Sequence, residues 1–159
     1  MKYWEVYESK IGPLTILCDD EALLRIDFGT VEPKNAVRDR SELIGRTEGQ
    51  LEEYMAGTRT EFDLPLKPEG TEFQKKVWNA LLLIPYGETK SYKDIAVLID
   101  NPKGCRAVGM ANNRNPIPII IPCHRVIGAN GSLIGYGGGL DIKVKLLELE
   151  RLKAYQYNY

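Results

Sequence analysis

The sequence predicts an α/β (α+β) protein: a small N-terminal antiparallel sheet with a helix, followed by a mostly helical C-terminal domain that contains a helix-turn-helix. Three observations favour this fold class. Residues 3–28 alternate apolar and polar side chains in short runs, as strands do. Residues 41–55 and most segments beyond residue 70 space their apolar side chains with the helical period. Residues 63–70, which include prolines and a glycine, separate the two patterns.

The length and composition are sufficient for two small domains. The chain has 159 residues, of which 43% are hydrophobic, and we place the boundary in the linker, which gives domains 1–68 and 69–159. The longest apolar run, residues 117–121, is too short to span a membrane, and the first residues lack the apolar region of a signal peptide. We therefore expect a cytoplasmic or nucleoid location. Three cysteines and a single histidine predict reduced thiols and no metal site.

Three strands are predicted in the N-terminal domain, at residues 3–9, 14–18 and 23–28. Gly12-Pro13 supplies the first turn and Asp19-Asp20-Glu21 the second. Strands joined by such short turns form an antiparallel meander.

A helix follows the strands at residues 41–55. Ser41 is a plausible N-cap, and Gly57 fits the end of the helix. The side chains expected to be buried share one face: Leu43, Ile44, Leu51 and Tyr54.

The first helix after the linker begins at a Thr71 cap, runs to about Leu83 and stops before Pro85-Tyr86-Gly87. Its expected buried residues are Phe73, Val77, Trp78 and Leu81. Two further short helices are predicted at residues 92–99, capped by Ser91, and at residues 103–112. Two short helices across a tight turn predict a helix-turn-helix.

The helix at residues 103–112 carries two stripes of side chains. One is expected to pack inward: Gly104, Ala107, Val108 and Ala111. The other consists of Arg106, Gly109, Met110 and Asn113. A glycine here lowers helix stability by about 1 kcal/mol relative to alanine, which indicates a close approach to the backbone. A DNA groove wall and a neighbouring helix fit this observation equally well.

The charge is unevenly distributed along the chain. The formal net charge is -1, but residues 1–68 hold 14 acidic and 9 basic residues, whereas residues 69–159 hold 8 and 12. Between Asn101 and Gly128 there are four cations and no acid. A polyanion would therefore meet the second half, although a solvated charged face gives the same pattern.

An apolar run at residues 117–121 leads to the chemically most reactive segment. Pro118 interrupts the run and Pro122 ends it, so it is predicted to be a rigid buried strut rather than a central strand. Cys123 and His124 follow directly. Cationic neighbours and a hydrogen-bonded histidine lower the pKa of a thiol, and the thiolate is the nucleophile. Taken alone, this dipeptide is equally consistent with an inert buried cysteine.

Several motifs around this dipeptide decide between the two readings. They are Tyr86-Gly87-Glu88-Thr89, Ser91-Tyr92, Arg106-Ala107-Val108-Gly109, Asn115-Pro116, Ile121-Pro122-Cys123-His124-Arg125-Val126 and Gly135-Tyr136-Gly137-Gly138-Gly139-Leu140. Their order and spacing closely resemble the O6-alkylguanine-DNA alkyltransferase family. The resemblance is continuous from about Thr71 to Glu150. For residues 1–68 it extends only to length and architecture, with a ribonuclease H-like domain implied.

The resemblance implies a role for each residue near the thiol. Cys123 would accept the alkyl group irreversibly, and His124 would reach it through a water molecule. Glu150 would orient His124, with Glu148 as the nearby alternative. Asn115 would tie the helix-turn-helix to the strut, although an asparagine before a proline is also a common turn former.

The resemblance also implies how DNA is bound. The alkylated nucleotide would leave the stack, Arg106 would fill the gap from the minor groove, and Tyr92 would crowd the neighbouring phosphate and donate a proton to the leaving guanine. Further contacts to DNA are expected from Gly109, Asn113, Lys93, Asn101 and Arg125. The alkyl pocket would be formed by Pro118, Val126, Tyr136 and Gly137, with residues 135–139 as a lid. Some relatives have serine in place of Gly137, so its side-chain contact would be missing here.

The implied partner is double-stranded DNA that contains O6-alkylguanine, with O4-alkylthymine as a second substrate, and no cofactor is implied. A monomer is expected. Two other classes of protein remain as alternatives: a non-catalytic helix-turn-helix regulator with a structural Cys123, and a cysteine hydrolase. The chain lacks an evident effector domain for the first and a second histidine for the second.

Overall fold

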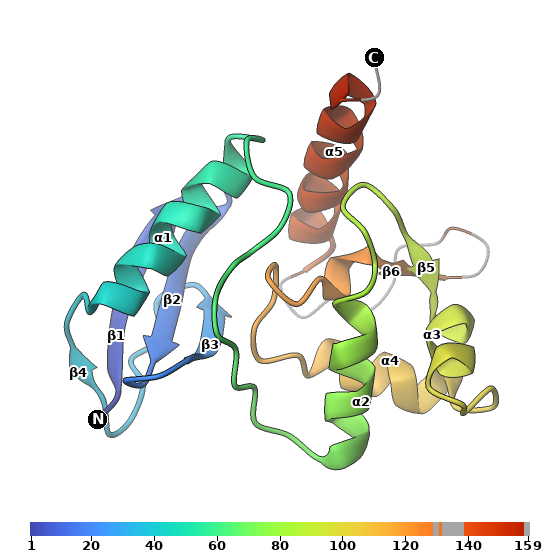
Figure 1. The fold of residues 1–159 in the computed structure, drawn as a ribbon, viewed down its shortest axis with the longest axis horizontal. Coiled ribbons are helices and arrows are strands. Elements are labelled where there is room, and N and C mark those ends of the chain that lie inside the picture. The colour runs from blue at the N-terminus through green and yellow to red at the C-terminus, as the bar shows by residue number, and fades with distance from the viewer. Residues whose placement is uncertain (129–130, 132–138, 158–159) are drawn as a thin grey trace. The chain divides into compact units, whose positions relative to one another are not determined.

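The computed structural model describes residues 1–128, 131 and 139–157, with side chains up to residue 151. The chain forms two compact units, Met1–Glu69 and Gly70–Tyr159 (Figure 1). No helix in the described part of the chain is long and apolar enough to cross a membrane.

The N-terminal unit is built on a four-stranded sheet in the order β3-β2-β1-β4. Strands β1 (Tyr3–Ser9), β2 (Gly12–Cys18) and β3 (Leu23–Phe28) form the predicted antiparallel meander. The short strand β4 (Val37–Arg38) pairs with β1 in parallel. The sheet is therefore mixed, whereas the prediction was a purely antiparallel sheet. Two residues are too few to show an alternating pattern, and the sequence therefore gave no signal for β4.

Helix α1 (Glu42–Met55) lies against β1 and β2 (Figure 1). The hydroxyl of Ser41 accepts a hydrogen bond from the amide of Ile44, so Ser41 is the N-cap. Ile44, Leu51 and Tyr54 are buried as predicted, whereas Leu43 is half-buried.

The linker pairs with the edge of the sheet before it enters the second unit. The amide of Leu23 donates to the carbonyl of Pro65, and the amide of Lys67 donates to the carbonyl of Leu23. Within the second unit, a side chain at Gly70 would collide with the ring of Trp78, so only glycine fits at this position.

The C-terminal unit begins with α2 (Glu72–Leu81), which Thr71 and Gln74 cap reciprocally. The indole of Trp78 donates to the carbonyl of Ala111 at 2.9 Å and joins α2 to α4. Phe73 and Ala107 were predicted to be buried, but Phe73 is half-buried and Ala107 is exposed. The two side chains line an open groove between α2 and α4.

Helices α3 (Tyr92–Leu98) and α4 (Cys105–Asn113) pack together across a short turn and form the helix-turn-helix. Ser91 and Asp94 make a capping box at the start of α3. Asp100 enters the turn with a φ of 60°. The remaining elements are β5 (Lys90–Ser91), the 3₁₀ turn η1 (Cys123–Arg125), β6 (Val126–Ile127), which pairs with β5, and α5 (Leu140–Tyr157).

Candidate active site and DNA-binding surface

The strut that leads to Cys123 is buried along its whole length, from Pro116 to Pro122. It is coiled rather than extended: the amide of Ile121 donates to the carbonyl of Ile117, and Ile119 has a φ of 74°. A β-branched residue rarely adopts this conformation, so the surrounding packing must hold it there. The strut therefore presents the next residue in a fixed position.

The side chains of Cys123 and His124 do not point to opposite faces, as those of neighbouring residues in an extended chain would. Both lie in η1, where the amide of Arg125 donates to the carbonyl of Pro122. A 3₁₀ turn rotates successive side chains by about a third of a circle. Cys123 is 4% exposed and His124 is completely buried, so both reactive groups lie beneath the protein surface.

The side chain of Asn115 fixes the start of the strut. Its amide nitrogen donates to the carbonyl of Ile121 at 2.8 Å, and its amide oxygen accepts from the backbone amide of Ile117 at 3.0 Å. The second bond is the turn-forming bond and the first is the longer-range tie. Asn115 thus makes both the backbone tie that the family resemblance implies and the bond of a turn former.

A buried carboxylate contacts the two residues that follow Cys123 in the chain. His124 Nε2 lies 2.6 Å from Glu150 Oε2, and Arg125 donates to the same carboxylate at 2.7 and 3.1 Å. The backbone amide of Gly87 also donates to it, at 3.3 Å. Glu150 is 1% exposed, whereas Glu148, the alternative partner, is on the exposed side of α5.

The ionisation states of this cluster follow from burial and pairing. Burial alone would raise the pKa of Glu150, but the hydrogen bonds and charges of His124 and Arg125 outweigh it and lower the pKa to about 2. Burial lowers the pKa of His124, against the opposing effect of Glu150. Burial thus favours the neutral form of His124. In that form the ring proton lies on Nε2, because a carboxylate can only accept, and Nδ1 is left as a proton acceptor.

Nδ1 of His124 is buried and has no hydrogen-bond partner among the described residues. A basic nitrogen in this state, held by a carboxylate on its far side, can accept the proton of a neighbouring thiol directly or through water. These three groups are therefore candidates for a nucleophile, a base and a group that orients the base.

Arg125 does not take the DNA-binding position that the sequence suggested. Its side chain is buried against Glu150, its Nη1 donates to the carbonyl of Ile84 at 2.7 Å, and its guanidinium lies over the ring of Tyr86. An arginine enclosed by a carboxylate and a backbone carbonyl cannot reach a phosphate. The prediction was wrong because the sequence does not show which cation of a basic segment finds a buried partner.

Lys143 is a functional candidate that the sequence reasoning missed. It lies on α5, is completely buried, and donates from Nζ to the carbonyl of Val126 at 2.7 Å. Burial lowers its pKa, and a charge on Cys123 acts in the opposite direction. The available signal was its position seven residues before Glu150, two helical turns away on the same face.

Replacing Lys143 with glutamine is expected to raise the pKa of the Cys123 thiol, because it removes a nearby buried cation. Glutamine retains a donor for Val126. The rate of alkylation by iodoacetamide as a function of pH measures this pKa. A Lys145→Gln variant, which removes an exposed charge from the same helix, is the control, and equal profiles for the two variants would contradict the role of Lys143.

Tyr92 is the first residue of α3 and is half-buried. Burial raises the pKa of its hydroxyl, and the charge of Cys123 raises it further. The phenol therefore stays protonated and lies within electrostatic range of the thiol. This placement is compatible with proton donation near Cys123.

The remaining predicted DNA contacts lie on one helix-turn-helix and are solvent-exposed: Arg106, Asn113, Lys93 and Asn101. Met110, in the same stripe of α4 as Arg106, is 62% exposed. The amide of Asn101 also packs over Gly104, where a side chain would collide with it, so Asn101 shapes the turn as well.

Gly109 is not required by packing inside the protein. An added methyl group would lie 3.8 Å from the ring of Tyr92, which is ordinary van der Waals contact. Helix-to-helix packing, one of the two explanations for this glycine, therefore does not account for it. Contact with a groove wall remains the prediction.

We expect Gly109→Ala to leave the fold intact and to raise the free energy of unfolding by up to about 1 kcal/mol, from helix propensity. Duplex DNA should bind about tenfold more weakly, because an extra methyl group in a tight contact costs on the order of 1 kcal/mol or more. Chemical denaturation and fluorescence anisotropy measure the two effects. Gly49→Ala, in the exposed part of α1, should give only the stabilisation; equal DNA affinity for both variants would contradict the contact.

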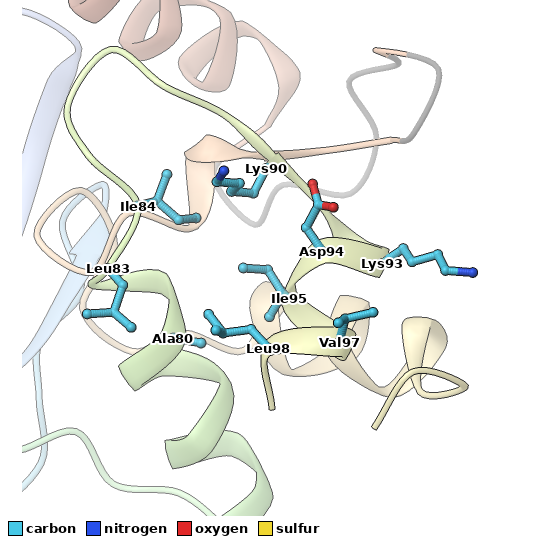
Figure 2. Close-up of a pocket in the computed structure, with 9 residues that line it drawn as sticks. All are labelled: Ala80, Leu83, Ile84, Lys90, Lys93, Asp94, Ile95, Val97 and Leu98. Atoms are coloured by element: carbon cyan, nitrogen blue, oxygen red, sulfur yellow. The ribbon is translucent and has the colours of Figure 1, made fainter. Parts of the chain in front are cut away.

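The expected alkyl pocket is described only in part. Pro118 and Val126 are buried, but Tyr136, Gly137 and most of the predicted lid lie outside the described residues. A separate pocket of about 400 Å³ opens between the end of α2 and α3 (Figure 2). Its lining is mostly apolar, and Lys93 extends away from it. Neither Cys123 nor His124 is among its lining residues.

A helix-turn-helix in the same unit as a buried cysteine and a buried histidine–carboxylate pair is the arrangement of a DNA-binding domain that carries a candidate nucleophile. Comparison with known sequences identifies it further. The profile of the 6-O-methylguanine DNA methyltransferase DNA-binding domain matches residues 72–152, and that of the ribonuclease-like domain of the same family matches residues 2–68. The chain belongs to the 6-O-methylguanine DNA methyltransferase family.

Individual relatives match over nearly the whole chain. A methylated-DNA–protein-cysteine methyltransferase of Methanosarcina acetivorans is 55% identical over 93% of this chain and 97% of its own. One from Mycobacterium tuberculosis is 50% identical over 97% and 95%. The crystal structure of the M. tuberculosis protein in complex with DNA superposes with a TM-score of 0.90 and 47% identity, covering 95% of this chain and 94% of that one.

Proposed function

We propose that this protein repairs O6-methylguanine in DNA by transferring the methyl group to the sulfur of Cys123. The Cys123 thiolate attacks the methyl carbon, an S–C bond forms, and the C–O6 bond breaks. The electron pair of that bond stays on O6, and the leaving guanine gains a proton. Because the product is a stable thioether, each molecule reacts once.

One observation supports this proposal most directly: His124, the residue after Cys123 in the same 3₁₀ turn, forms a buried pair with Glu150. A neutral histidine whose free nitrogen accepts a proton produces the thiolate that the displacement requires. The relatives named above carry this activity in their names, and the related M. tuberculosis structure holds DNA. Together they favour a reactive over an inert cysteine.

The burial of Cys123 sets the order of events on DNA. A thiol that is 4% exposed cannot reach a base inside a duplex, so the damaged nucleotide has to leave the stack and enter the site. Arg106, exposed on α4, would occupy the vacated position from the minor groove. Tyr92 would supply the proton for the leaving guanine. The minor groove carries a degenerate code, so little sequence preference is expected. A monomer, working in the cytoplasm, is sufficient for this reaction.

The test uses a duplex whose single O6-methylguanine carries a labelled methyl group. Peptide mapping after incubation should place one label on Cys123, with one equivalent transferred per protein and unmodified guanine left in the DNA. A helix-turn-helix regulator would bind the duplex without acquiring a label, and a hydrolase would release the label with turnover. Either result would refute the proposal. O4-methylthymine in the same duplex context tests the second expected substrate.

A further inference from the structure

Asn112 is a buried polar residue that has no role in the reaction steps described above. It lies on the inner side of α4, next to the buried Ala111, and is 1% exposed. Its amide nitrogen donates to the backbone carbonyl of Cys123, with a distance of 3.3 Å between the two atoms. The helix that carries Arg106 and Gly109 is therefore bonded to the main chain of the acceptor residue.

The other half of this amide is not satisfied in the same way. Asn112 Oδ1 is buried and accepts no hydrogen bond from the residues that the structure describes. A buried acceptor without a partner lowers stability, so a leucine of similar size would suit this position better by packing alone. The feature that a leucine could not supply is the bond to Cys123.

The bond from Asn112 is the second of two hydrogen bonds that hold the segment 121–123 to α4 and to the residues directly after it. Asn115, just beyond the end of α4, holds the carbonyl of Ile121 at 2.8 Å, and Asn112 holds the carbonyl of Cys123. The amide of Cys123 itself donates to the carbonyl of Ile121 at 2.7 Å. If only one of these bonds were present, the peptide of Cys123 could still rotate about that single point. Two attachments fix both its position and its orientation relative to α4.

We propose that Asn112 is a positioning residue for alkyl transfer, which holds the Cys123 backbone at a set distance and angle from the DNA-binding helix. The inference rests on the proposed function. When α4 is seated on DNA, the location of the extruded nucleotide is set relative to that helix. The line of attack of the sulfur on the methyl carbon is then set by the same helix through Asn112.

In-line displacement is sensitive to such positioning, because a misplacement of about 1 Å can cost on the order of 100-fold in rate. We therefore expect Asn112→Leu to slow the single-turnover methyl transfer step by about 10- to 100-fold. The DNA concentration at half-maximal rate should not change, since no group that faces DNA is altered. The pKa of the Cys123 thiol should not change either, since a neutral amide is lost.

The experiment compares two replacements that remove the donor but differ in their effect on stability. Asn112→Leu removes the unpartnered oxygen and should melt at or above the temperature of the wild type. Asn112→Asp has the same shape but places a carboxylate against the Cys123 carbonyl and should melt lower. Asn79→Leu, on the exposed side of α2, is the matched control for an asparagine-to-leucine change.

If Asn112 positions the thiol, both variants at this site are slow whatever their melting temperatures, and the control reacts at the wild-type rate. A wild-type rate in Asn112→Leu would overturn the inference, as would a slow rate only in the variant that melts lower. A raised thiol pKa in Asn112→Leu, measured with iodoacetamide, would also overturn it, because Asn112 would then act on ionisation. The wild-type protein in the same assay tests the proposed function separately: it alone has to transfer the methyl group for that function to hold.

Discussion

Cys123→Ser is expected to bind methylated DNA and to leave the lesion unrepaired. A serine hydroxyl ionises far less readily than a thiol, and its oxygen is a much weaker nucleophile than a thiolate sulfur toward a methyl carbon. The loss of methyl transfer should therefore be on the order of 10⁴-fold or more. Transfer is measured as labelled methyl on the protein, and binding as anisotropy with the same duplex.

Cys18 provides the control for this variant. It is completely buried in the N-terminal unit, and burial raises its pKa to about 12, so it carries almost no thiolate at neutral pH. Cys18→Ser should transfer the methyl group at the wild-type rate. Methyl label on Cys123→Ser protein, at any other residue, would disprove the assignment of the acceptor.

Glu150→Leu is expected to lower the free energy of unfolding by about 3–5 kcal/mol, because it leaves the buried Arg125 without its partner. Glu150→Gln should be milder in stability, but it should slow methyl transfer by about 100-fold or more, since His124 loses the charge that holds it as a base. Glu148→Leu, on the exposed side of the same helix, should change stability by less than about 0.5 kcal/mol. Equal unfolding free energies for the variants at 148 and 150 would rule out this role.

The same carboxylate predicts how stability depends on pH. The pKa of Glu150 is about 2 in the folded protein and 4.5 as a free side chain, so its ionised form is favoured by folding. Its contribution is complete above pH 4.5 and is lost as the pH falls towards 2, because the unfolded chain takes up the proton first. The difference corresponds to about 3 kcal/mol. Urea unfolding at a series of pH values should show this loss in the wild type, and Glu150→Gln should lack it.

Much of the fold could be predicted from local sequence patterns. The alternation of apolar and polar residues predicts β1 to β3. Ser41, Thr71 and Ser91 could be predicted as N-caps because each stands directly before a stretch with helical periodicity, and each is an N-cap in the structure. Strand β4 could not be found, because a two-residue pairing has no pattern of its own. The left-handed conformation of Ile119 was equally hidden, since it is imposed by packing and contradicts the preference of the residue.

The site was less accessible to reasoning from residues. Spacing alone left Cys123 undecided, and the pairing of His124 with Glu150 came from the family resemblance, because these residues lie 26 positions apart. Arg125 was placed on DNA and Lys143 was overlooked for one physical reason. Whether a cation is solvated or buried depends on which distant segment packs over it, and no local pattern records that.

The burial of Lys143 has a consequence for the fate of the protein after its single reaction. Among the described buried groups around Cys123, Arg125 is paired with Glu150, and a charge on Cys123 opposes the effect of burial on the cation of Lys143. Methylation would turn the sulfur into a neutral thioether, which carries no negative charge. Lys143 would then lose its favourable interaction with a thiolate while it stays buried. The new bond at one sulfur atom thereby leaves an electrostatic imbalance at the buried Lys143 on α5. This imbalance distinguishes the reacted protein from the unreacted one.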